Sequence, residues 1–409
     1  MSEILFYNIG RYYTADTKAG YGRIKSAENV HIRVRDGHIE EIGTGGINAG
    51  QSAQTVDCHG LTLLPGFVDA HTHPVFYKTR EEEFVMRVQG KSYEQIAAAG
   101  GGIRNSVRRF READKETIKE RTRKRIAVFP EYGTTTIEAK SGYGLSKEDE
   151  IKSLEIIAEL NREQPLEMIP TFLGAHEVPD EYRDRRGDYI DLVCNEMIPE
   201  VGERKLARFC DVFCEKDVFS VEESRRILEC GRAHGLTPKL HADELYPLGG
   251  AELSAEVRAI SADHLLEISD KGIQRMADEG VMAVLLPGTT FFLGKERYAP
   301  ARKMLDKGLE VVIATDYNPG SSATQNLQLM TTLGAIKMRM MPEELLWAIT
   351  FSAARAIGME DHIGHLEVGK QADFVLMDIP NLHYLPYHYG INHTVMTVKK
   401  GNIIYQKGD

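Results

Sequence analysis

The stretch that decides the fold runs from Leu64 to Pro74, LPGFVDAHTHP, a short apolar segment that ends in two histidines separated by one residue. In a β-strand, side chains at positions i and i+2 point to the same face, so both imidazoles of such a pair can reach one metal ion. Three other apolar runs also end in side chains of a metal-ligand type, at His241, His264 and Asp316. The sequence therefore predicts that several strand ends converge on one site.

The middle of the chain alternates between apolar segments of strand length and charged amphipathic segments typical of helices. Eight strands alternating with helices indicate a TIM-type (β/α)8 barrel, in which catalytic groups lie at the C-terminal ends of the parallel strands. The histidine and aspartate positions fall at such ends. The eight strands are expected near residues 64–73, 133–139, 167–175, 208–215, 238–243, 259–264, 281–287 and 310–316.

Both ends of the chain carry strand patterns of a different kind. Residues 31–42 alternate around Asp36-Gly37, a pair that favours a tight hairpin, and the C-terminal segments 372–377 and 395–405 are also strand-like. We therefore expect an α/β protein of two domains. These are a small composite β-sandwich domain from residues 1–62 and 366–409, and a barrel from residues 63–365.

Composition and charge argue against several classes of protein. The chain has 409 residues, 42% of them hydrophobic and 8% aromatic, which is typical of a soluble globular protein. Its net charge of −11 argues against nucleic-acid binding, which needs a dense basic patch. Without a basic leader or a run of 18 apolar residues, the expected location is cytoplasmic and away from membranes. The five cysteines show no C-x-x-C spacing and predict neither a disulfide framework nor a zinc ribbon.

The order of these groups resembles the amidohydrolase superfamily, with His-x-His on the first barrel strand, histidines on the fifth and sixth, and an aspartate on the eighth. The His-x-His pair is common to that whole superfamily, whereas other blocks are more specific and are similar to those of the imidazolonepropionase family. The likeness spans the chain. The blocks are residues 138–145 (EAKSGYGL), 173–176 (LGAH), 241–244 (HADE) and 314–321 (ATDYNPGS).

The chemistry and the resemblance together imply a metal centre. Three imidazoles and one carboxylate suit a divalent or trivalent ion such as zinc or iron, with one position left open for water, and the sequence does not distinguish these metals. In similar enzymes a carboxylated lysine on the fourth strand can hold a second metal, but here that strand ends without a lysine, and Glu215 is a possible bridge that nothing else in the sequence supports. We therefore favour one ion per subunit over two. The predicted ligands are His71, His73, His241 and Asp316.

The resemblance also implies an activity, the hydrolysis of 4-imidazolone-5-propanoate to N-formimidoyl-L-glutamate in histidine degradation. Candidates for proton transfer are Glu244, His264 and Asp316, and the sequence leaves open which is the general base. Arg80 is expected to clamp the propionate, although an ion pair with the adjacent Glu81–Glu83 is an equal alternative by spacing alone. The further predicted substrate contacts are Tyr143, His176, Glu244, Asn318, Gly320 and Ser321.

Two other functions stay open at this point. The same metal set would serve another cyclic amidohydrolase or a nucleobase deaminase, but a neutral nucleobase would leave Arg80 without a carboxylate partner. A barrel that had become a non-catalytic scaffold would be expected to lose its metal ligands, and here all four are present. The resemblance further predicts a homodimer that acts on a small molecule.

Overall fold

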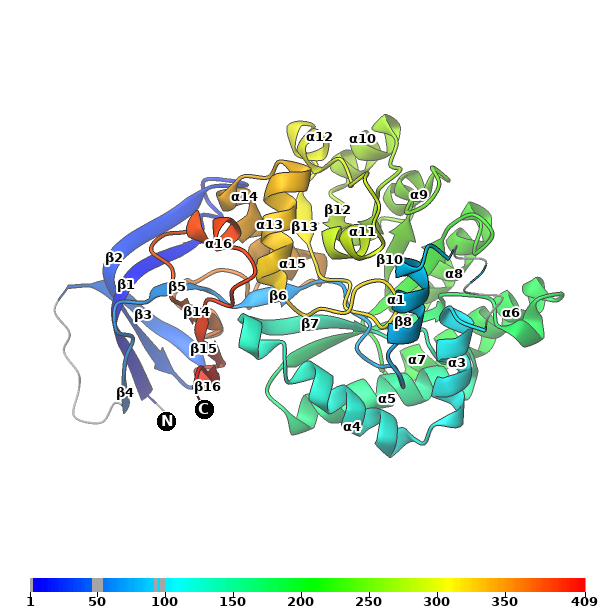
Figure 1. The fold of residues 1–409 in the computed structure, drawn as a ribbon, viewed down its shortest axis with the longest axis horizontal. Helices are drawn as coiled ribbons and strands as arrows, with labels where there is room; N and C mark the ends of the chain where they lie inside the picture. The colour runs from blue at the N-terminus through cyan, green and yellow to red at the C-terminus, as the bar shows by residue number, and fades with distance from the viewer. Residues whose placement is uncertain (1–2, 46–53, 92–94, 96–99, 409) are drawn as a thin grey trace.

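The structure is a computed structural model, and it describes residues 3–45, 54–91, 95 and 100–408. Its strands form two separate sheets of eight strands each (Figure 1). Sheet B belongs to the larger body with its surrounding helices, and sheet A joins the blue N-terminal and red C-terminal parts of the chain. Residues 46–53 of the predicted composite domain lie outside the described residues.

Sheet B is parallel, and its strands follow one another in sequence order. Backbone hydrogen bonds from Asp316 N to His71 O (3.1 Å) and from His73 N to Tyr317 O (2.8 Å) bring the end of the last strand back to the first. The predicted TIM-type barrel is confirmed. Its strands are β6 (Phe67–Asp69), β7 (Thr134–Lys140), β8 (Glu167–Ala175), β9 (Phe209–Cys214), β10 (Thr237–Ala242), β11 (Ser261–His264), β12 (Met282–Leu285) and β13 (Val311–Ile313).

The first predicted strand divides between the two sheets. Strand β5 (Thr62–Pro65) pairs in sheet A, and β6 begins the barrel after Gly66. A side chain has no room at Gly66, because its Cβ would lie 2.5 Å from a neighbouring threonine hydroxyl. His71 and His73 therefore follow the strand, whereas the sequence predicted a strand over residues 64–73 that would include them.

Helices cover the outside of the barrel (Figure 1). Ser146 caps α5 by accepting a hydrogen bond from the amide of Asp149, and Ser220 with Glu223 forms a capping box at α8. The α-helices are α1 (Glu81–Val88), α3 (Ile103–Glu112), α4 (Lys115–Ile126), α5 (Lys147–Glu163), α6 (Arg186–Leu192), α7 (Ile198–Glu203), α8 (Val221–Ala233), α9 (Gly250–Glu256), α10 (Asp270–Glu279), α11 (Pro287–Phe292), α12 (Ala301–Asp306), α13 (Leu327–Met338), α14 (Pro342–Ala348), α15 (Phe351–Ala356) and α16 (Tyr384–Tyr387), with short 3-10 turns η1 (Pro130–Tyr132) and η2 (Asp180–Tyr182) and a π-helical turn η3 (Val193–Met197).

Sheet A is built from both ends of the chain, as predicted, in the order β16-β15-β14-β5-β1-β2-β3 with β4 beside β1. It curls on itself, because the amide of Ala372 donates to Gly37 O at 2.9 Å, and the rings of Phe6 and Phe374 meet 4.9 Å apart in its core. The residue boundaries of the two domains stay a prediction. The strands are β1 (Glu3–Ala15), β2 (Ile24–Arg35), β3 (His38–Thr44), β4 (Gln54–Asp57), β5, β14 (Phe374–Met377), β15 (Thr394–Lys399) and β16 (Asn402–Gln406).

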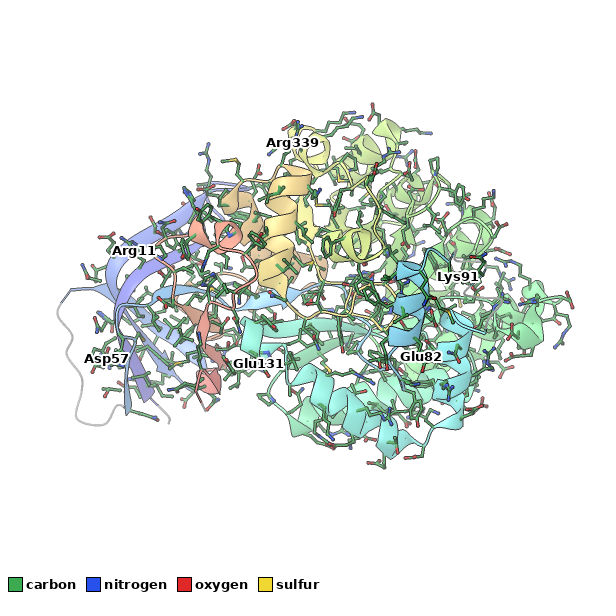
Figure 2. The ribbon with its side chains drawn as sticks, viewed as in Figure 1. Arg11, Asp57, Glu82, Lys91, Glu131 and Arg339 are labelled. Carbon is green, nitrogen blue, oxygen red and sulfur yellow. The ribbon has the colours of Figure 1, made fainter. Side chains whose placement is uncertain are left out.

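Charged side chains cover the outer surface, where Glu82, Lys91 and Arg339 are exposed (Figure 2). Among the described helices, none combines the length and apolar character needed to cross a bilayer. Polar groups that are buried inside the barrel are therefore the ones that require a functional explanation.

Candidate active site

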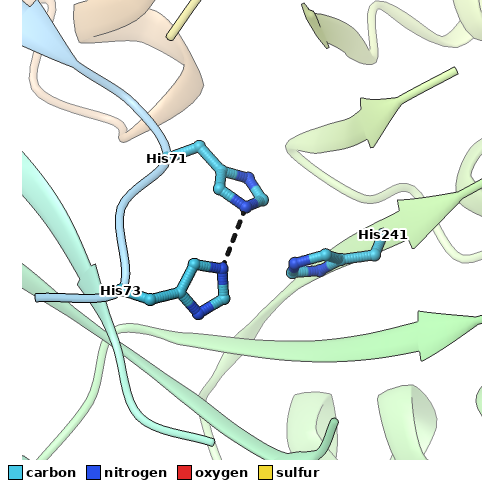
Figure 3. A group of neighbouring side chains, drawn as sticks. All are labelled: His71, His73 and His241. Carbon is cyan, nitrogen blue, oxygen red and sulfur yellow. Dashed lines mark hydrogen bonds between the residues drawn. The ribbon is translucent and has the colours of Figure 1, made fainter. Parts of the chain in front are cut away.

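Three imidazoles converge just beyond β6 and at the end of β10 (Figure 3). One nitrogen from each of His71, His73 and His241 lies within 4.8 Å of the others, and Nε2 of His71 is 3.2 Å from Nε2 of His73. Oδ1 of Asp316 lies 3.5 and 3.6 Å from these two nitrogens, while its Oδ2 accepts a 2.5 Å hydrogen bond from Thr289. Tetrahedral ligand atoms about 2.1 Å from a metal are about 3.4 Å apart. The spacing therefore fits a single ion.

Hydrogen bonds determine which ring nitrogen faces this centre. Nδ1 of His71 lies 2.6 Å from Asp263 Oδ2, and Nδ1 of His241 lies 3.0 Å from Asp211 Oδ2. Because an ionised carboxylate only accepts hydrogen bonds, each Nδ1 carries the proton and each Nε2 presents a lone pair. Converging lone pairs repel one another unless a cation lies between them, so the donor set fits a metal ion.

The protonation states of His71 and His73 also fit a metal. Burial holds the pKa of His71 and of His73 well below the usual imidazole value. Burial acts on His241 in the same direction, but the Asp211 carboxylate outweighs it and raises the pKa of that ring. Burial raises the pKa of Asp316 to about 7, and a cation beside it would favour the ionised form. Neutral imidazoles and a carboxylate are the forms that bind metals.

A network of five fully buried charged residues lies next to the histidines, and the sequence-based site did not include it. Nζ of Lys140 is 2.8 Å from Glu138 Oε1, 2.7 Å from Asp211 Oδ2 and 3.5 Å from Asp263 Oδ2. Lys239 approaches Glu138 Oε1 at 3.4 Å. Burial acts to lower the pKa of Lys140, but the surrounding carboxylates raise it above the ordinary value. The available sequence signal was charge inside otherwise apolar strands.

Glu244 and His264, two of the three candidates for proton transfer, lie side by side. Oε2 of Glu244 is 3.6 Å from Nδ1 of His264, and the His264 ring lies 5.2 Å from that of His241. Burial raises the pKa of Glu244 and lowers that of His264. Glu215, the residue considered for a second metal, instead accepts a 2.8 Å hydrogen bond from the amide of Leu245 and so holds the loop that carries Glu244.

His176 and Tyr143 flank His73. The His176 and His73 rings stack with centroids 5.3 Å apart, and the Tyr143 ring lies 5.6 Å from His176. Nδ1 of His176 donates to Gly142 O at 2.9 Å, so its Nε2 carries the lone pair. Burial lowers the pKa of His176 to about 3 and raises that of Tyr143, which leaves both side chains neutral.

Arg80 forms the ion pair that the sequence had left as an alternative. Its Nε and Nη2 donate to Oε1 and Oε2 of Glu83 at 2.9 and 2.6 Å. Its remaining nitrogen packs against Gly320, where a Cβ would lie only 2.4 Å from Nη1. Arg87, which sequence reasoning missed, donates from Nη2 to Gly320 O at 2.6 Å, and its buried Nη1 has no hydrogen-bond partner among the described residues. The available sequence signal was the spacing of seven residues between Arg80 and Arg87, which places both on the same face of a helix.

The polar side chains of the turn after Asp316 form hydrogen bonds within that turn. Nδ2 of Asn318 donates to Asp316 O at 2.7 Å, and its Oδ1 accepts from the amides of Gly320 (2.7 Å) and Ser321 (2.8 Å). The Ser321 hydroxyl accepts a 2.9 Å hydrogen bond from Asn318 Nδ2. These two side chains hold Gly320 in place beside Arg80, and direct substrate contacts by Asn318, Gly320 and Ser321 stay predictions.

Comparison with known proteins defines the family. Residues 86–405 match the family model described as Amidohydrolase family, and the chain belongs to that family. Over 387 residues it is 50% identical to the imidazolonepropionase of Geobacillus sp. strain WCH70, covering 93% of this chain and 91% of the relative. Over 418 residues it is 43% identical to the imidazolonepropionase of Alkaliphilus metalliredigens strain QYMF, covering 100% and 99%. Within the amidohydrolases it therefore falls among the imidazolonepropionases.

Solved structures share the same architecture at low sequence identity. Guanine deaminase of E. coli superimposes with a TM-score of 0.76 at 16% identity, covering 100% of both chains. An adenosine deaminase from Xanthomonas campestris gives a TM-score of 0.71 at 18% identity, covering 98% of this chain and 92% of that one. At these identities the likeness establishes the fold alone.

Proposed function

We propose that this chain hydrolyses 4-imidazolone-5-propanoate to N-formimidoyl-L-glutamate, a reaction of histidine degradation. The observation that carries the proposal is the 50% identity to a curated imidazolonepropionase over 93% of the chain. The buried cluster of imidazoles and carboxylates agrees with it, because cleavage of a cyclic amide needs an activated water and groups that move protons.

The proposal includes one zinc or iron ion per subunit, held by His71, His73, His241 and Asp316. Such an ion would lower the pKa of a water molecule toward neutrality and polarise the scissile carbonyl. His71 and His241 are suited to this role because their Nδ1–H groups donate hydrogen bonds to Asp263 and Asp211, which leaves each Nε2 free to bind the ion. A cytoplasmic location, expected from the sequence, and a homodimer, implied by the family resemblance, belong to the same proposal, and sedimentation velocity tests the dimer.

Glu244 is proposed to carry the proton. Its raised pKa suits a carboxylate that accepts a proton from the attacking water and returns it to the ring nitrogen when the carbon–nitrogen bond breaks. The water oxygen then becomes part of the new carboxylate, and the proton remains on the released nitrogen. Neutral His264, 3.6 Å from Glu244, is placed to orient the water or to donate to the oxyanion.

The propionate tail is proposed to lie against two guanidinium groups. The bidentate edge of Arg80 already holds Glu83, which leaves its Nη1 for the substrate. Nη1 of Arg87, which has no hydrogen-bond partner in the described part of the chain, supplies a second donor near Gly320. Tyr143 and His176, next to His73, would contact the ring.

The direct test is the loss of imidazolone absorbance on adding purified, metal-loaded protein, compared with spontaneous decay of the compound. We expect a rate well above the decay rate and the product mass of N-formimidoyl-L-glutamate. Guanine is the control substrate for the deaminase alternative. Decay at the spontaneous rate, or release of ammonia from guanine, would contradict the proposal.

A further inference from the structure

Lys140 lies where two carboxylates from different barrel strands come together. Its Nζ is 2.7 Å from Asp211 Oδ2 and 3.5 Å from Asp263 Oδ2. Asp211 in turn holds Nδ1 of His241, and Asp263 holds Nδ1 of His71. One ammonium therefore connects two metal-site histidines that are far apart in the sequence.

We propose that Lys140 is a positioning residue of the metal centre, whose ammonium fixes both carboxylates and thereby the tautomer and orientation of His71 and His241. The inference rests on the proposed metal centre and not on the identity of the substrate. A fully buried ammonium is unfavourable unless it is closely paired. Here it is paired with the two carboxylates that the histidines need.

The charges around Lys140 give the physical reason. Without it, the carboxylates of Asp211, Asp263 and Glu138 would face one another across a buried space, and like charges at this range repel strongly in a low dielectric. Repulsion would turn Asp211 or Asp263 away from its histidine. A histidine that loses this partner can place its proton on Nε2, where the metal must bind.

The ammonium of Lys140 also lies beside a second group of side chains that could otherwise bind a metal ion. Ligand atoms of His71, Glu138 and Asp263 lie within 4.8 Å of one another, a spacing compatible with a metal ion. Lys140 Nζ lies 2.8 Å from Glu138 Oε1 and 3.5 Å from Asp263 Oδ2, so a protein charge already neutralises this group. This agrees with a centre of one ion.

Lys239 provides a matched control. It is equally buried and lies two residues before His241 on β10. Its Nζ is 3.4 Å from Glu138 Oε1 and donates to Ala356 O at 3.4 Å. Among the described residues it makes no ion pair with Asp211 or Asp263, although its positive charge stabilises the Asp263 carboxylate at longer range. Lys239→Met therefore removes a buried charge, with its longer-range effect on Asp263, but leaves the direct contacts of Lys140 with Asp211 and Asp263 in place.

The experiment compares Lys140→Met, Lys239→Met and the wild-type protein after loading with Co²⁺. Affinity is measured by competition with a chelator, and the visible absorption of the bound ion reports its coordination. We expect Lys140→Met to lose at least about tenfold in Co²⁺ affinity and to change the spectrum, while Lys239→Met keeps both. With the imidazolone substrate, kcat should fall with little change in KM.

A second variant covers the case in which Lys140→Met does not fold. The double variant Lys140→Met with Glu138→Gln removes one negative charge with the positive one, and Asp211 and Asp263 are retained. It should show the same loss of affinity and the same spectral change, with an intact fold by circular dichroism. Wild-type affinity and spectrum in the folded Lys140 variants would overturn the inference, as would an equal loss in Lys239→Met.

The wild-type protein separates this inference from the proposed function. If it binds no stoichiometric Co²⁺, the metal centre and the role of Lys140 both fail. If it binds Co²⁺ and the Lys140 variants behave as expected but the imidazolone is not hydrolysed, the positioning role stands and only the substrate assignment fails.

Discussion

Arg80 donates to both carboxylate oxygens of Glu83, at 2.9 and 2.6 Å, from the residue that precedes α1. The guanidinium edge that best matches a substrate carboxylate is therefore occupied by the protein itself. Among the described residues, Nη1 of Arg80 and Nη1 of Arg87, which has no hydrogen-bond partner there, remain as donors near Gly320. A substrate tail held there would contact two arginines through one nitrogen each.

Arg80→Met and Arg87→Met should each raise KM for 4-imidazolone-5-propanoate. A hydrogen bond to a charged group contributes about 1.5–3 kcal/mol, which corresponds to a change of at least about tenfold. The tail amide analogue, which lacks the negative charge, should show a much smaller change. Arg108→Met, which alters an exposed arginine of α3, is the control. An unchanged KM in both variants would place the tail elsewhere.

Gly320→Ala should weaken substrate binding in the same way without removing a charge. The added Cβ would lie 2.4 Å from Arg80 Nη1, so the guanidinium must move. Gly187→Ala is the matched control, because a Cβ at that position meets nothing within 4 Å. We expect a several-fold rise in KM for Gly320→Ala alone, and equal kinetics of the two variants would rule out close packing of Arg80 on this turn.

Glu244→Gln should retain the metal and bind substrate while kcat collapses. The substitution keeps the size of the side chain and removes the proton acceptor, a loss that commonly costs two to four orders of magnitude, roughly 10²–10⁴. Metal content by elemental analysis and kcat by the absorbance assay decide the matter together. A variant with near-normal kcat would assign proton transfer to His264 or Asp316.

The same substitution should change how stability depends on pH. Burial raises the pKa of Glu244 in the folded protein above its unfolded value, so folding favours the protonated form. The metal-free wild type therefore loses stability as pH rises from the unfolded pKa, about 4.3, through the folded one. Glutamine cannot ionise, so Glu244→Gln should melt higher than wild type at pH 8 and lose this advantage at pH 4. A lower melting temperature at pH 8 would contradict burial as the cause.

His73→Ala should lose bound metal and activity while the barrel remains folded. The ring supplies one nitrogen 3.2 Å from that of His71, and its removal opens the donor set without disturbing the large apolar core. Elemental analysis and circular dichroism measure the two effects separately. His234→Ala, an exposed histidine at the end of α8, is the control and should keep its metal. Stoichiometric metal in His73→Ala would remove that residue from the centre.

The sequence predicted the barrel well because its strands are apolar runs separated by amphipathic helices. Strand β8 occupies the predicted residues 167–175, and the other barrel strands differ from prediction mainly at their ends. β13 stops at Ile313, short of the predicted residue 316, and beyond it Asp316 takes a left-handed conformation with φ of 52°. Pattern alone does not reveal where a chain leaves a sheet to present a ligand.

The candidate site was predictable where a residue type carries its own chemistry, as at His71 and His73. The supporting network was harder to predict because it depends on which strands close around one interior. Lys140, Asp211 and Asp263 meet only after three separate strands assemble. Their signal in the sequence is a charged residue within an apolar strand, and this pattern alone does not show with which residue the charge pairs.

The composite sheet has a consequence for the order of synthesis. Pro65 of β5 pairs with Phe374 of β14, and all eight barrel strands lie between them in the chain. A ribosome that adds about 5–20 residues per second needs roughly 15–60 s to make that interval. Throughout this time the edge of β5 opposite β1 is unpaired and open to association with other nascent chains. β14, which covers this edge, is translated after all eight barrel strands, so the protein is protected from such association only when its synthesis is nearly complete.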